Sequence, residues 1–162
     1  MNASWYGKVR KWFLEAPWRM ALLTAAYRGL PLFVAAGYPI CLVFCLLYRR
    51  ELLARAILVP AAMFLAVSVF RHFVNFARPY EKEGIVPLIQ KEKQGHSFPS
   101  RHAASAGMVA AVWMAYSRPA GILFLAVGIL IAVSRVLAGV HYVKDVLAGG
   151  VSGYFAVWIF FM

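Results

Sequence analysis

The sequence contains few acidic residues, few cysteines and little charge of any kind. Only 14% of its 162 residues are charged and 63% are hydrophobic, whereas soluble domains average about a quarter charged and about half apolar. A soluble core of this size cannot bury so much apolar surface, because roughly a third of the chain's surface stays exposed after folding. The same hydrophobicity excludes a disordered chain. These deficits predict an integral membrane protein.

Two further classes are not expected: proteins stabilised by disulfides or zinc, and proteins that bind nucleic acid. Cys41 and Cys45, the only cysteines, are one helical turn apart in an apolar stretch. This placement favours packing residues over a disulfide framework or a cysteine-ligated zinc site. Seventeen Lys and Arg face only six Asp and Glu, giving a net charge of +11. Nucleic acid is not an expected partner, because helices buried in hydrocarbon leave little surface for a duplex. The basic residues can instead meet membrane lipids or an anionic substrate.

Five apolar stretches approach the roughly 20 residues that a spanning helix needs. They cover residues 29–48, 52–70, 102–117, 119–133 and 146–162. We therefore predict an all-α, polytopic transmembrane helix bundle of about five to six membrane helices. It would be a multi-pass protein of the cell membrane.

The N-terminal segment differs from these stretches, because residues 4–28 interleave tryptophans with Lys and Arg. This pattern is typical of an amphipathic helix that lies in the membrane interface. We therefore divide the chain into an interfacial segment, 1–28, and a single transmembrane domain, 29–162. Alternatively, the segment joins residues 29–48 in one longer tilted or broken helix, with kinks at Pro31 and Pro39.

Three polar clusters flank the long loop 71–101 and the last hydrophilic turn. The first contains Arg71 and Arg78, which would share one helical face about 10.5 Å apart along the axis. The second, Gly95-His-Ser-Phe-Pro-Ser-Arg-His102, runs into an apolar helix. Ser100 would lie at its N-cap, where free backbone N–H groups favour a phosphate.

The third cluster contains Ser134, Arg135, His141 and Asp145. A His and an Asp four residues apart on a helix are neighbours. The carboxylate can then hold one imidazole nitrogen protonated and leave the other as a nucleophile or base. Such a pair is also compatible with half of a metal site.

Each cluster alone has an ordinary explanation, because arginines at helix ends snorkel and a membrane histidine can be structural. Alternating spans, however, place all three clusters on one side of the membrane. Four guanidinium groups around one cavity would repel each other without an anion, and phosphate matches their charge and geometry. Those guanidinium groups belong to Arg71, Arg78, Arg101 and Arg135.

The three clusters together resemble the tripartite signature of the type 2 phosphatidic acid phosphatase superfamily. The matching patterns are Arg71-x6-Arg78-Pro79, Pro99-Ser100-Arg101-His102 and Ser134-Arg135-x5-His141-x3-Asp145. They occur in the family's order, with its usual apolar helix pair between the second and third. The superfamily includes membrane lipid phosphatases and soluble vanadium haloperoxidases. The apolar spans favour the former.

The resemblance implies a role for each matching residue. His141 would be the nucleophile that forms a phosphohistidine, Asp145 would orient it, and His102 would be the general acid and then the base. The phosphoryl oxygens would be held without any metal or cofactor by Arg71, Arg78, Ser100 and Arg135. Two positions depart from the family: Arg71 replaces its common Lys, and Arg101 replaces its common Gly. Arg101 would point to solvent or reach the second phosphate of a diphosphate.

The resemblance implies a substrate that is a lipid phosphate or diphosphate, such as undecaprenyl diphosphate, phosphatidylglycerophosphate or phosphatidic acid. The alternative is a non-catalytic lipid-phosphate binding or transport protein with the same arginine pocket. Family members usually place the site on the extracytoplasmic face. The Arg49-Arg50 turn would then be cytoplasmic, as the positive-inside rule favours. An odd number of spans would, however, put the basic N-terminal segment outside.

Overall fold

The computed structural model describes residues 2–90 and 94–162, and these residues form helices and connecting segments without strands. Lys91, Glu92 and Lys93 of the polar loop lie outside the described residues. The helices are α1 (Ala3–Leu14), α2 (Pro17–Tyr48), α3 (Arg50–Val74), α4 (Pro79–Lys82), α5 (Arg101–Tyr116), α6 (Arg118–Leu137) and α7 (Val143–Trp158). Each of the five predicted apolar stretches falls largely within one long helix.

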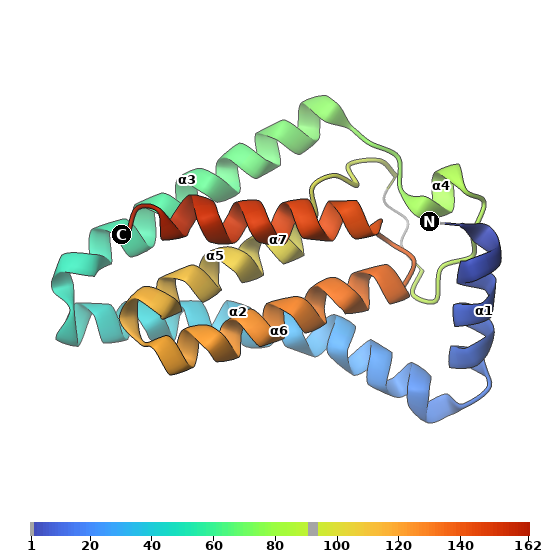
Figure 1. The fold of residues 1–162 in the computed structure, drawn as a ribbon, viewed down its shortest axis with the longest axis horizontal. Helices are drawn as coiled ribbons and strands as arrows, with labels where there is room; N and C mark the ends of the chain where they lie inside the picture. Colours follow the sequence, from blue (N-terminus) through green and yellow to red (C-terminus); the bar gives the residue numbers. More distant parts are fainter. Residues whose placement is uncertain (1, 91–93) are drawn as a thin grey trace.

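The five long helices alternate in direction, so the ends of α3 and α6 lie toward the same end of the bundle as the starts of α2, α5 and α7 (Figure 1). In the described part of the chain, three stretches are long and apolar enough to cross a membrane: Pro17–Tyr48, Arg50–Lys82 and Arg118–Leu137. The helices α5 and α7 have 16 residues each and fall short of that length. The expected all-α membrane bundle is confirmed.

The N-terminal segment divides at Glu15 and Ala16, before Pro17. Proline suits the first helical position, where its missing N–H costs nothing, and α2 begins there. Residues 17–28 therefore belong to the long helix α2, as the tilted-helix alternative proposes, and the expected boundary after residue 28 lies inside it. Helix α1 is separate and runs across the end of the bundle (Figure 1).

The helices α5 and α7 pack closely because glycines line their contact. A Cβ atom at Gly149 would lie 2.5 Å from the Ser100 carbonyl oxygen, and one at Gly153 would collide with the Ala104 carbonyl oxygen. Small residues spaced by four let membrane helices approach backbone to backbone. This contact brings the start of α7 against the start of α5, where the Ser100 N–H donates to the Asp145 carbonyl oxygen at 2.8 Å.

A polar contact near Pro60 joins the helices α2 and α3. Proline has no N–H, so the carbonyl oxygen four residues earlier, at Ala56, loses its helical donor. The Tyr38 hydroxyl of α2 donates to that oxygen at 2.7 Å. This bond links the two helices across the groove described below.

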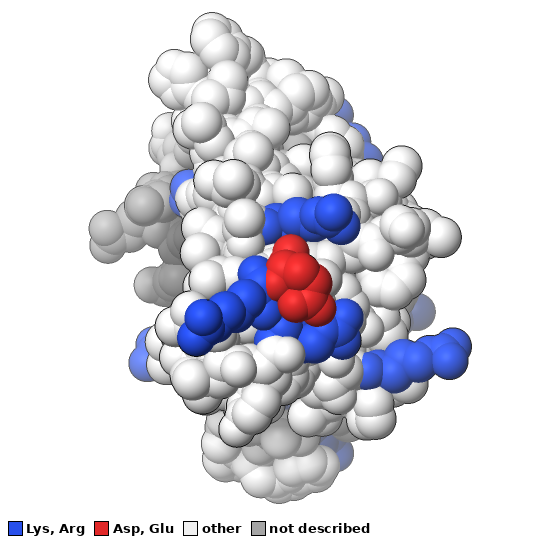
Figure 2. Space-filling view, turned by 90° about the vertical axis from the view of Figure 1, so that its left-hand side faces the viewer, with Lys and Arg blue, Asp and Glu red and all other residues white. Residues whose placement is uncertain are grey.

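The end of the bundle opposite to α1 carries several basic side chains. Figure 2 shows Lys and Arg side chains gathered around a small acidic area on this end. At the turn between α2 and α3, the Arg49 Nε lies 2.5 Å from a Glu51 carboxylate oxygen. Arg50 and Arg55 donate to the carbonyl oxygens of Leu46 and Phe160.

Candidate functional site

The first polar cluster forms where α3 ends. Its last helical residue is Val74, and Asn75 caps it in the left-handed conformation at φ 40°. Arg78 follows this turn as the N-cap of α4. The expectation that Arg71 and Arg78 share one helical face is therefore wrong. The chain reverses at Asn75, and this turn brings the two side chains to the same loop.

Both arginines are buried and bind backbone carbonyl groups. The Arg71 guanidinium donates to the carbonyl oxygens of His96, Ser97 and Pro99. Arg78 donates to the carbonyl oxygens of Gly95, at 2.9 Å, and Val140, at 3.1 Å. Carbonyl groups are neutral, so these hydrogen bonds do not cancel the two positive charges, and the pair favours a nearby anion.

A polar cavity of about 400 Å³ lies beside these arginines. It is lined by Ser68, Arg71, His72, Arg78, Gln94, Gly95, His96 and Arg101. Three of the four arginines expected around an anion are thus brought together. Among the residues that the structure describes, no acidic side chain lines this cavity, which suits it to a negatively charged group.

The fourth arginine, Arg135 at the end of α6, is buried against α2. Its guanidinium carbon lies 3.7 Å from the centre of the Tyr27 ring, and it donates to the Tyr27 carbonyl oxygen at 3.0 Å. Pro31 explains this contact, because it removes the helical donor of that carbonyl four residues earlier. The polar cavity is not lined by Arg135, whose Nε has no hydrogen-bond partner among the described residues.

Ser100 is the N-cap of α5, as its sequence position predicts. Its side chain makes no capping bond, and its buried Oγ has no hydrogen-bond partner in the described chain. The first turn of a helix presents unpaired N–H groups and a partial positive charge. A hydroxyl group is therefore held unpaired at an end of a helix that favours anions.

The histidine–aspartate pair forms at the start of α7. His141 Nδ1 lies 3.4 Å from Asp145 Oδ2, and both side chains are almost fully buried. His141 precedes α7, which begins at Val143, so the expectation that both residues lie on one helix is wrong. Asp145 is the third helical residue and accepts from the Tyr142 N–H at 3.0 Å. This capping bond brings its carboxylate back toward His141.

Burial lowers the pKa of His141 to about 4, although the hydrogen bond to Asp145 opposes this. The nearby charges of Arg78 and Arg71 lower it further. An unprotonated imidazole therefore persists well below neutral pH. An imidazole whose Nδ1 keeps its proton toward Asp145 carries its free electron pair on Nε2.

Three residues for which the sequence motifs predict no role hold this site together. Ser97 is fully buried, donates to Asp145 Oδ2 and lies 3.5 Å from His141 Nδ1. Glu81 accepts from the N–H groups of Arg78 and Gly95, and Asn75 accepts from that of His96. Ser97 lies inside the second cluster, but only the fold shows which serine of that cluster reaches the aspartate.

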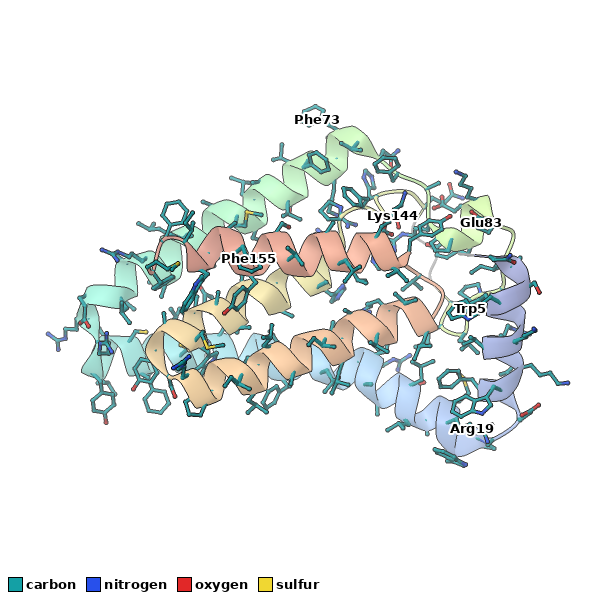
Figure 3. The ribbon with its side chains drawn as sticks, viewed as in Figure 1. Trp5, Arg19, Phe73, Glu83, Lys144 and Phe155 are labelled. Carbon is teal, nitrogen blue, oxygen red and sulfur yellow. The ribbon has the colours of Figure 1, made fainter. Side chains whose placement is uncertain are left out.

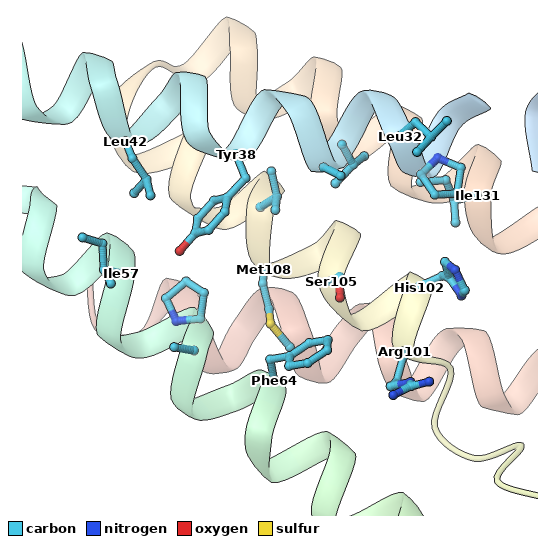
Figure 4. A pocket seen from close by; sticks show the side chains of 16 residues that line it. Leu32, Tyr38, Leu42, Ile57, Phe64, Arg101, His102, Ser105, Met108 and Ile131 are labelled. Carbon is cyan, nitrogen blue, oxygen red and sulfur yellow. The ribbon is translucent and has the colours of Figure 1, made fainter. Parts of the chain in front are cut away.

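His102 and Arg101 stand at the mouth of a large apolar groove of about 920 Å³. Figure 4 shows both side chains at one end and Leu42 and Ile57 at the other. The walls come from α2, α3 and α5, with Ile131 of α6. Arg101 lines both this groove and the polar cavity, so the two spaces meet at its side chain.

No group of three or more His, Cys, Asp or Glu side chains that could hold a metal ion occurs in residues 2–90 and 94–162.

Comparison with known proteins adds independent findings. A family model described as the PAP2 superfamily matches residues 51–162, which include all three clusters. The crystal structure of Aquifex aeolicus LpxE is similar with a TM-score of 0.61 and 24% identity, over 86% of this chain and 92% of that one.

A second similar structure is a transmembrane PAP2 type phosphatidylglycerolphosphate phosphatase from Bacillus subtilis. Its TM-score is 0.70 at 22% identity, over 98% of this chain and 83% of that one. At these identities, the two similarities establish a shared fold.

Proposed function

Since the chain belongs to the PAP2 superfamily, we propose that it hydrolyses a lipid phosphate or diphosphate through a phosphohistidine intermediate. The observation that carries this proposal is the meeting of two spaces. A polar cavity with three arginines and an apolar groove along the helices share Arg101, and the next residue, His102, lines the groove. A molecule with an anionic head and a long apolar chain fits this pair of spaces.

The head of the substrate would bind at the arginines. Arg71, Arg78 and Arg101 surround the polar cavity, and Ser100 contributes a hydroxyl at the start of α5. Fixed donors of this kind stabilise charge that develops on phosphoryl oxygens in the transition state. Arg135 would join them as the fourth cation, by extending from its place beside Tyr27.

His141 would act as the nucleophile. Its Nε2 attacks phosphorus, the bond from phosphorus to the leaving oxygen breaks, and His102 donates a proton to that oxygen. A water molecule then attacks the phosphohistidine while His102 takes its proton. Phosphate leaves, and His141 is regenerated. Asp145 would hold the Nδ1 proton throughout, with Ser97 fixing the carboxylate.

The apolar groove would hold the chain of the lipid. Its wall on α2 runs from Pro31 to Leu42, which is about 16 Å at 1.5 Å per residue. Half of a bilayer's hydrocarbon core is about 15 Å. The length of the groove therefore matches the depth of one leaflet.

Arg101 suggests a diphosphate head. It adds a third guanidinium to the cavity where the family pattern has glycine, and a diphosphate carries more charge and more oxygens than a monophosphate. Replacing Arg101 with Gly should therefore reduce kcat/KM for a lipid diphosphate more than for a monophosphate. An equal change for both would contradict this assignment. Undecaprenyl diphosphate is the diphosphate to test first.

A phosphate-release assay on purified protein tests the proposal. The panel would contain undecaprenyl diphosphate, phosphatidylglycerophosphate and phosphatidic acid, and His141→Ala should abolish turnover of the preferred lipid. Rapid quenching with a labelled phosphoryl group should trap label on the wild type and not on His141→Ala. Arg50→Ala, at the opposite end of the bundle, is the matched control. Binding without turnover in the wild type would favour the alternative of a lipid-phosphate binding or transport protein.

We also propose that the site faces the extracytoplasmic side of the cell membrane. The turn with Arg49 and Arg50 would then be cytoplasmic, as the positive-inside rule favours. An impermeant maleimide applied to intact cells should label Val86→Cys, because the side chain at position 86 is exposed. It should spare Arg50→Cys. The reverse pattern would place the site in the cytoplasm. The native cysteines are buried and leave a low background.

A further inference from the structure

Tyr6 is a buried residue on a helix that is otherwise largely exposed. Its side chain is 1% exposed, whereas Trp5 and Trp12 on the same helix are about half exposed. Figure 3 shows Trp5 on α1 at the same end of the molecule as Glu83 and Lys144. The α1 helix precedes the residues that match the family model. Neither the motifs nor the mechanism above gives Tyr6 a role.

The Tyr6 hydroxyl joins three segments of the chain. It donates to the Leu137 carbonyl oxygen at 3.2 Å and accepts from the Leu88 N–H at 3.1 Å. Leu137 ends α6, and Leu88 belongs to the loop after α4. Burial raises the pKa of Tyr6, so the hydroxyl keeps the proton that it donates.

Donors from three other segments bind the backbone carbonyl groups of the turn from Leu137 to His141. Tyr6 binds that of Leu137, the Leu88 N–H binds that of Ala138 at 3.1 Å, and the Arg78 guanidinium binds that of Val140. His141 follows immediately. Of these three donors, Arg78 lines the polar cavity. The Leu88 N–H is shared between the Ala138 carbonyl oxygen and the Tyr6 hydroxyl, so Tyr6 contacts the turn at Leu137 and also contacts the residue that binds Ala138.

Gly139 allows Tyr6 to approach this turn. It has a φ of +79°, a conformation that L side chains rarely adopt, and a Cβ at this position would collide with the Tyr6 hydroxyl. The tyrosine ring therefore packs directly on the backbone two residues before His141. Any shift of Tyr6 is transmitted to that backbone.

We propose that Tyr6 is a positioning residue that ties the interfacial helix α1 to the turn carrying His141. This inference rests on the proposed function, in which His141 attacks phosphorus. A nucleophile that is misplaced by about 1 Å loses up to about 100-fold in rate. The substrate's head and chain bind elsewhere, in the cavity and the groove, so the loss should fall on kcat and spare KM.

Tyr6→Phe tests the inference, because it removes the hydroxyl and leaves the ring. We expect kcat to fall about tenfold, within the range of such misplacements, with KM changed less than twofold. The control is Tyr48→Phe, an exposed tyrosine at the opposite end of the bundle, which should leave kcat and KM unchanged. An unchanged kcat in Tyr6→Phe would overturn the inference. A fall in activity that only matches the loss of folded protein would overturn it too.

Hydrogen exchange separates this inference from the proposed function. In Tyr6→Phe the amides of residues 137–141 should exchange faster than in the wild type, and Tyr48→Phe should leave them unchanged. This readout does not depend on turnover. If the wild type releases no phosphate from any lipid, the proposed function fails, and faster exchange still supports the tie. Equal exchange in the wild type and Tyr6→Phe would overturn the positioning role of Tyr6, even if the wild type is an active phosphatase.

Discussion

The helix pairs α5–α7 and α2–α3 differ in how closely they pack. The first pair meets through glycines and brings Ser100, Asp145 and His141 together. The second contains prolines and lines a groove of about 920 Å³. Close packing suits groups that must keep a fixed geometry, and an open groove suits a flexible lipid chain. Under the proposed function, the chemistry belongs to the closely packed pair and the capture of the lipid chain to the groove.

The largest expected effect comes from Asp145, which lies in the closely packed helix pair α5–α7. Asp145→Asn keeps the size of the side chain but removes the charge that orients His141. An uncharged amide can also select the wrong imidazole tautomer, and we expect kcat to fall by about 10³-fold or more. Phosphate release checks this. A loss of less than tenfold in a folded protein would contradict the role of Asp145.

The close packing of α5 against α7 can be tested with two glycines of α7 that are three residues apart. A methyl group at Gly153 would collide with the Ala104 backbone, whereas one at Gly150 has only an ordinary contact at 3.9 Å. Gly153→Ala should therefore destabilise by about 2 kcal/mol through overpacking, and Gly150→Ala should be nearly neutral. Thermal unfolding in detergent measures both. Equal stability of the two variants would show that α5 and α7 are not in close contact.

The apolar groove can be blocked without disturbing the contact between α5 and α7. Ala61 lines the groove on α3, and Ala61→Trp would fill part of it. We expect KM for a long-chain lipid phosphate to rise about tenfold, or about 1.4 kcal/mol. The kcat/KM for a short-chain, water-soluble phosphate should stay the same. If both substrates lose equally, the groove does not hold the chain.

The smallest expected effect concerns pH. Burial lowers the pKa of His141 to about 4, so between about pH 6.5, its unfolded value, and pH 4 the unfolded chain binds a proton that the folded protein does not. Stability should fall as the pH drops through this window. Melting temperatures of wild type and His141→Ala should therefore converge between pH 7 and pH 4.5. Parallel curves would show that His141 titrates normally.

The sequence was informative wherever a local pattern has one physical explanation. Apolar stretches of about 20 residues predicted the long helices, and the three motifs identified the superfamily to which the chain belongs. Pro17 starts α2 and Ser100 caps α5, as their residue types favour. The division of the chain after residue 28 could not be fixed in this way, because aromatic and basic residues suit both an interfacial helix and the end of a long one.

Contacts between distant segments could not be predicted in the same way. The expected shared helical faces for Arg71 with Arg78, and for His141 with Asp145, were wrong, because turns at Asn75 and Tyr142 interrupt the helices. Arg135 was expected beside the other arginines and lies against Tyr27 instead, since Pro31 frees the carbonyl group that it binds.

The sequence by itself determined that this chain is a helical membrane protein with a set of residues suited to phosphate chemistry, because hydrophobic length and residue type are local properties. Only the tertiary structure decided that Ser97 reaches Asp145, that the Tyr6 hydroxyl binds the Leu137 carbonyl group, and that Arg101 lines both the cavity and the groove. Each of these contacts depends on how helices far apart in the chain approach one another. That approach is set by glycines, prolines and turns acting together.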